Sequence, residues 1–144
     1  MTKQEFYDAL VTAASDGTFP SAKPGEYTRT CLYALRDDKN PEIIHRCAAG
    51  LLLQDLSLAK TEGMRGGCYH HAELFNSRLP EGMTLDDLSQ TQVIHDDCCV
   101  SKMSEDEQDK SMHVIFLKER FLKSLNSLPF FADCQQTKPQ EVAH

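Results

Sequence analysis

Two apolar runs on either side of a charged, proline-containing stretch constrain the fold of this chain most strongly. The first run covers residues 27–35 and contains Cys31, and the second follows RDDKNPE (36–42) and contains Cys47. The first run is rich in tyrosine, threonine and leucine without a helical stripe, which predicts a strand. Three interpretations of the two cysteines are open: they form half of a metal site, they form a disulfide, or they are two small core residues on facing strands.

The second run fits two interpretations. Asn-Pro-Glu at 40–42 is a good helix start, so one interpretation is a helix over 41–59. Gly50 inside that helix costs about 1 kcal/mol relative to alanine. The other interpretation is a strand over 43–49, a break at Gly50 and a short helix after it. Periodicity does not decide between them for a continuous apolar run.

Capping boxes predict where helices begin elsewhere in the chain. The box at 2–5 begins an N-terminal helix that Gly17 ends, and the box at 84–87 begins a helix that reaches about residue 100. A third box, at 104–107, begins the longest helix, which Pro129 ends. The apolar stripe of this last helix consists of Val114, Leu117, Phe121, Leu125 and Leu128.

These elements predict an α+β fold. It has an N-terminal helix, a β-hairpin or small antiparallel sheet, and about three helices, one of which is over 69–79; an all-α fold is the alternative. Residues 1–134 are expected to form one globular domain, and 135–144 a polar tail. No run of about 18 apolar residues occurs, which predicts no membrane span.

The compartment is predicted from the start of the chain and from the cysteines. MTKQEFYDAL carries acidic residues early and has no apolar core of a signal peptide, so we expect a cytoplasmic protein. The six cysteines are then expected to be reduced thiols rather than disulfides.

One segment holds the whole net charge of −7. Residues 84–109 carry eight acidic side chains against one lysine, and the rest of the chain carries 14 acidic and 14 basic side chains. Such a segment repels nucleic-acid phosphates and attracts basic protein surfaces, although exposed helix faces and helix starts also favour acids. The predicted partner-binding residues are Asp86, Asp87, Asp96, Asp97, Glu105, Asp106, Glu107 and Asp109.

Cysteines and histidines give one candidate metal site. Zinc prefers four thiolate or imidazole ligands, commonly from closely spaced pairs. No C-x-x-C motif occurs, but one C-x-H and one i, i+3 pair do. The candidate zinc ligands are Cys68, His70, His95 and Cys98. Buried thiols are the simpler interpretation, and the chain carries no motif for any other cofactor.

Two other motifs suggest chemistry. His95-Asp96 follows apolar residues, as in the HD phosphohydrolases, where adjacent His and Asp bind a metal; His70 or His71 is the upstream candidate. Arg65-Gly66-Gly67 is a candidate anion-binding loop, through which the protein would sequester a nucleotide signal. No catalytic residues are assigned, because Cys68, the best placed nucleophile, lacks an assignable acid partner.

Five short motifs occur in an order that resembles a family of small hypothetical proteins of tailed phages and their bacterial hosts. The motifs are TFPS at 18–21, CLY at 31–33, RCAAGLL at 46–52, EGM at 62–64 and HD at 95–96. The spacer between the cysteines is longer here, and the loop before EGM differs. The resemblance implies phage origin, and therefore a place in the cytoplasm of the host cell. It also implies a hairpin with Cys31 and Cys47 on adjacent strands.

The expected function is therefore non-enzymatic. We expect a small acidic phage-type accessory protein that binds and blocks a host protein with a basic surface, with no direct contact to nucleic acid. An inhibitor of a nucleic-acid-handling defence system is the sharper form of this hypothesis. The alternatives are a metal-dependent HD-like phosphohydrolase and a binder of a nucleotide signal. The oligomeric state does not follow from the sequence.

Overall fold

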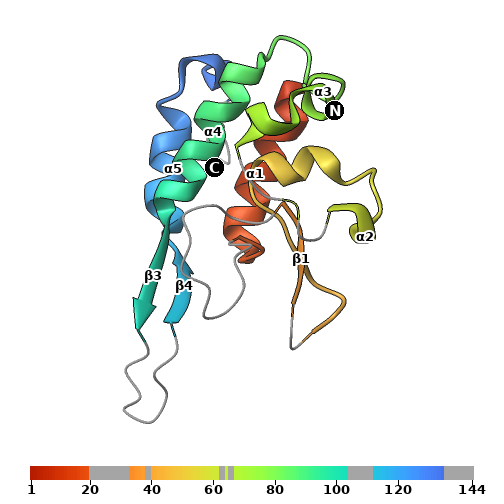
Figure 1. Cartoon of the computed structure of the whole chain (residues 1–144). Helices are drawn as coiled ribbons and strands as arrows, with labels where there is room; N and C mark the ends of the chain where they lie inside the picture. The colour runs from red at the N-terminus through yellow and green to blue at the C-terminus, as the bar shows by residue number, and fades with distance from the viewer. Residues whose placement is uncertain (20–32, 38–39, 62–63, 65–66, 104–111, 135–144) are drawn as a thin grey trace, which may run out of the picture.

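A computed structural model describes residues 1–19, 33–37, 40–61, 64, 67–103 and 112–134 (Figure 1). Its α-helices are α1 (Lys3–Asp16), α2 (Leu58–Thr61), α3 (Ala72–Asn76), α4 (Leu85–Cys98) and α5 (Lys118–Asn126). Its 3₁₀ helices are η1 (Ala49–Leu53), η2 (Cys68–His71) and η3 (Pro129–Phe131). Its strands are β1 (Leu35–Arg36), β2 (Ile44–His45), β3 (Cys99–Met103) and β4 (Met112–Phe116). The predicted α+β class is confirmed.

Two predicted capping boxes are confirmed. In α1, the Thr2 hydroxyl accepts from the Glu5 amide at 3.0 Å, and the Glu5 carboxylate accepts from the Thr2 amide at 2.7 Å. Gly17 ends this helix in the left-handed conformation, at φ 74°. At the start of α4, Thr84 and Asp87 form the same reciprocal pair, at 3.1 and 3.0 Å. Each box pairs two of the amide groups that a helix start leaves without partners.

The strands form two separate antiparallel pairs. β1 pairs with β2, with Leu35 opposite His45 and Arg36 opposite Ile44. β3 pairs with β4 with Cys99 opposite Phe116. Figure 1 shows this second hairpin continuing from the adjoining ends of α4 and α5.

The predicted long helix beginning at residue 104 is wrong where the structure describes it. Val114 lies in β4, and the helix begins only at Lys118. Residues 112–116 pair with the strand that directly follows α4, and a β-branched and aromatic run suits that pairing. α4 therefore also ends at Cys98, short of residue 100. The third capping box, at 104–107, lies outside the described residues.

Of the two interpretations of residues 41–59, the single helix is wrong. The chain forms β2, then η1, then α2, which is closer to the second interpretation, although the strand covers only two residues and Gly50 lies within η1. The helix predicted over 69–79 is shorter than expected, because η2 precedes α3 and α3 ends at Asn76. Cys31 and the polar tail lie outside the described residues.

One cluster of buried residues joins these elements. It runs from Phe6 in α1 to Cys134 after η3. α4 packs against α5, η1 and η2, and α1 packs against α5 and η1. No helix in the described part of the chain has the length and apolar content that a membrane crossing requires.

A substitution at Gly50 tests the close packing between η1 and Tyr33, which precedes β1. A Cβ atom at this position would overlap the carbonyl oxygen of Tyr33, which is backbone and cannot rotate away. We therefore expect Gly50→Ala to lower the free energy of unfolding by about 3 kcal/mol, measured by chemical denaturation. Gly67 is the matched control, because the one described residue that a Cβ there would meet is His70, at 3.8 Å. A loss from Gly67→Ala as large as that from Gly50→Ala would contradict this account.

Candidate functional site

The inner face of α4 carries a buried polar network. Gln92 is 7% exposed; its side-chain oxygen accepts the Ala49 amide at 2.8 Å, and its side-chain nitrogen donates to Asp96 at 2.7 Å. The Asp96 carboxylate also lies 3.1 Å from Nδ1 of His95, which has no exposed surface. Since a carboxylate is an acceptor, Nδ1 of His95 carries the proton in this contact. The network therefore ties the first residue of η1 to α4.

Aromatic rings enclose the imidazole of His95. Phe19 lies edge-on to it, with ring centroids 4.6 Å apart, and Phe116 lies 5.4 Å away. The thiol of Cys99, one helical turn along the chain, is 3.8 Å from each ring nitrogen. His95 thus packs α4 against Phe116 of β4 and against Phe19, which follows α1, and it does not face an opening.

The four candidate zinc ligands do not come together. Among the described residues, no group of three or more His, Cys, Asp or Glu side chains could hold a metal ion. Cys68 is buried with its thiol 3.8 Å from the Leu85 carbonyl, whereas His70 is exposed. Burial raises the pKa of the Cys68 and Cys98 thiols. Both residues are small members of the core.

The candidate anion-binding loop is only partly described. Arg65 and Gly66 lie outside the described residues, and Gly67 is exposed at the start of η2 with extended backbone. The anion-binding hypothesis therefore stays a prediction.

The predicted partner-binding acids of α4 have different surroundings. Asp87 caps the helix, and Asp96 accepts hydrogen bonds from the inner network. Asp86 and Asp97 remain on the exposed side. Four further predicted acids lie outside the described residues: Glu105, Asp106, Glu107 and Asp109. Of the four described acids, the structure leaves two for an outside partner.

Two exposed side chains with large apolar surfaces lie near the exposed acids of α4, and neither was predicted from the sequence. Val93 is 54% exposed on α4, and Tyr69 of η2 is 55% exposed. The Tyr69 hydroxyl donates to Asp86 at 2.8 Å, and this bond raises the pKa of the phenol. Asp86, Gln90, Val93 and Asp97 follow at spacings of four, three and four, so they share one side of the helix. We call Tyr69 and these four residues the outer face of α4.

A helical projection of 85–98 alone places Asp86, Val93 and Asp97 on one side of the helix. This part of the face could therefore be predicted from the sequence. Tyr69 was not, because its place depends on η2 packing against α4.

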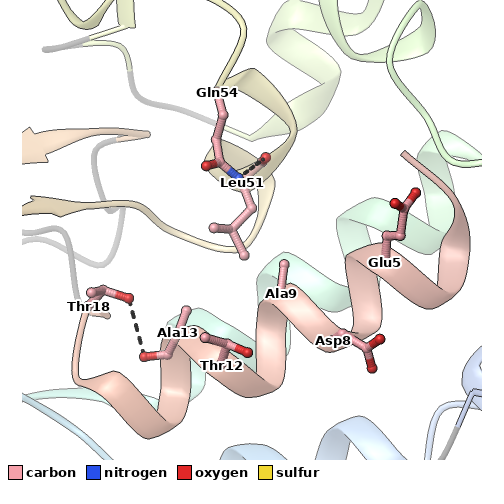
Figure 2. A pocket seen from close by; sticks show the side chains of 8 residues that line it. All are labelled: Glu5, Asp8, Ala9, Thr12, Ala13, Thr18, Leu51 and Gln54. Atoms are coloured by element: carbon pink, nitrogen blue, oxygen red, sulfur yellow. Dashed lines mark hydrogen bonds between the residues drawn. The ribbon is translucent and has the colours of Figure 1, made fainter.

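An open pocket of about 390 Å³ lies between α1 and η1. Figure 2 shows Leu51 of η1 pointing toward α1 near Ala9 and Ala13, which form an apolar floor. The carboxylates of Glu5 and Asp8 also line the pocket, with Gln54 and two threonines. No basic side chain is among the lining residues in the part of the chain that the structure describes. Hydrogen bonds from Thr2 lower the pKa of Glu5, which keeps this carboxylate ionised.

Comparison with known proteins adds nothing to these observations. No protein-family model, no curated protein and no solved structure matches this chain.

Gln92 tests whether the inner network holds η1 on α4. Gln92→Ala leaves the buried Ala49 amide without its partner, and we expect it to lower the free energy of unfolding by about 1–3 kcal/mol. Gln90 is the matched control: it is the same residue on the same helix, but it is exposed, and its side chain bonds to no described residue other than Asp86. Gln90→Ala should stay within about 0.5 kcal/mol in the same denaturation experiment. Equal losses from both variants would contradict the proposed role of Gln92.

Proposed function

We propose that this protein is a non-enzymatic accessory protein of phage type that binds and blocks a host protein through a basic surface on that protein. In its sharper form, the target is a defence protein that handles nucleic acid, and the acidic surface takes the place of phosphate. The observation that carries the proposal is the outer face of α4, where exposed apolar and acidic side chains lie together.

The composition of this face suits a protein partner. Protein interfaces combine a desolvated apolar or aromatic centre with a polar rim, and tyrosine is enriched among the residues that dominate binding. Here Val93 lies between Asp86 and Asp97, and Tyr69 is held against Asp86 by a hydrogen bond. Tyr69 is thus partly pre-organised, which lowers the entropy that binding would cost.

The charge of α4 determines the kind of partner. The helix contains no lysine or arginine, and its only histidine is buried. With a net charge of −7, the chain speeds its encounter with a basic surface and repels nucleic acid. A groove that binds phosphate through lysine and arginine has the complementary charge, which supports a nucleic-acid-handling target.

The test reverses the two exposed acids. Wild-type protein and the Asp86→Lys, Asp97→Lys double variant are immobilised and incubated with extract of the host, with and without competing double-stranded DNA. We expect the wild type to capture a nucleic-acid-binding protein, DNA to displace it, and the double variant to lose at least about 90% of the capture, because both reversals turn attraction into repulsion. Captured protein is measured by quantitative mass spectrometry.

The control variant is Glu73→Lys, Glu119→Lys. Both are exposed first-turn acids, on α3 and α5, so the variant changes net charge equally and matches the effect of Asp86→Lys on a helix start. It should keep the capture. Asp87 and Asp96 are left intact, because their reversal would damage the helix cap and the inner network. Capture that both variants retain, or both lose, would overturn the proposal.

A further inference from the structure

The pocket between α1 and η1 has more hydrogen-bond acceptors than donors. Glu5 uses one carboxylate oxygen to accept the Thr2 amide, and Asp8 uses one to accept from Gln4 at 3.0 Å. The nitrogen of the Gln54 side chain donates to the Leu51 carbonyl at 3.0 Å, which fixes this amide and leaves its oxygen as an acceptor. Carboxylate and amide oxygens therefore line the pocket, and none of its described lining residues is a basic side chain that would use them.

The floor of the pocket is apolar and its walls carry negative charge. Ala9, Ala13 and Leu51 offer a surface to methylene groups, as Figure 2 shows, and the carboxylates lie along the same stretch of α1. About 390 Å³ is at the lower end of the range for small-molecule pockets, which suits one long side chain. A side chain with an apolar stem and a cationic end with several donors matches both features.

We propose that this pocket binds an arginine side chain presented by a basic protein segment. The planar guanidinium has five donors in a fixed fork, so it can use more of the acceptors than a lysine ammonium can. Its stem lies over Ala9 and Leu51, and its charge faces Asp8 and Glu5. The inference rests on the proposed function, because it names the side chain by which a basic partner would be recognised at a second place on this protein.

The test uses a defined probe and no partner. Nα-acetyl-arginine amide is titrated into the ¹⁵N-labelled protein, and amide shifts are followed by NMR. We expect saturable shifts at Ala9, Ala13 and Leu51 that weaken as salt increases. Nα-acetyl-lysine amide should shift the same amides less. Nα-acetyl-citrulline amide has the shape of arginine without its charge, and it should not produce saturable shifts.

Two variants locate the binding. Asp8→Asn should weaken it about threefold to fivefold, as expected for an exposed ion pair. Thr12→Lys places a cationic side chain at the exposed edge of the pocket, and it should abolish the shifts at Leu51 by occupying the site. Asp16→Asn is the matched control, because it removes an acid from the same helix outside the pocket. It should bind like the wild type.

Shifts spread over other elements, equal binding of citrulline, or wild-type affinity in Asp8→Asn and Thr12→Lys would each overturn the inference. These failures are separate from a failure of the proposed function. If the probe does not bind but Asp86→Lys, Asp97→Lys still loses the host protein, the pocket inference falls and the outer face of α4 keeps its role.

Discussion

The fold depends on the burial of one segment, residues 47–53, between α1 and α4. Every residue of this segment is buried, including the backbone around Gly50. Burying backbone is costly unless its polar groups find partners. Gln92 supplies one by accepting the Ala49 amide, and the missing side chain of Gly50 lets the Tyr33 backbone approach. η1 can therefore contact α1 on one side and α4 on the other.

This burial also decides which acids of α4 are turned outward. Once Gln92 faces η1, the helical period turns His95 inward as well, and Asp96 completes the hydrogen bonds between them. A helix of 3.6 residues per turn then leaves Asp86, Val93 and Asp97 on the opposite side. The same packing of η1 creates the pocket beside α1. The inner network, the outer face of α4 and the pocket are thus three consequences of one buried segment.

The sequence predicts those parts of the fold that depend on neighbouring residues. The capping boxes at Thr2 and Thr84 are local hydrogen bonds, and both helix starts were predicted correctly. The hairpin of β3 and β4 was missed, because the partner of residues 112–116 is the strand 99–103, and pairing across an intervening segment leaves no helical or local signature. Of the apolar stripe that predicted a long helix, only Phe121 and Leu125 lie in α5.

The candidate sites also have parts that the sequence predicts and parts that depend on contacts between distant segments. A count of charges in 84–109 located the acidic segment, but it could not distinguish Asp97, which faces outward, from Asp96, which bonds to Gln92. The positions of the residues around the helix axis are enough to make that distinction. The pocket cannot be predicted in this way, because it forms only where η1 packs on α1, and no pattern in 1–19 indicates that contact. Net charge alone is therefore a poor guide to what a partner meets. Since the helix cap uses Asp87 and the buried network uses Asp96, only two of the four described acids face outward. Binding on α4 should therefore depend on the position of the acids more than on total charge.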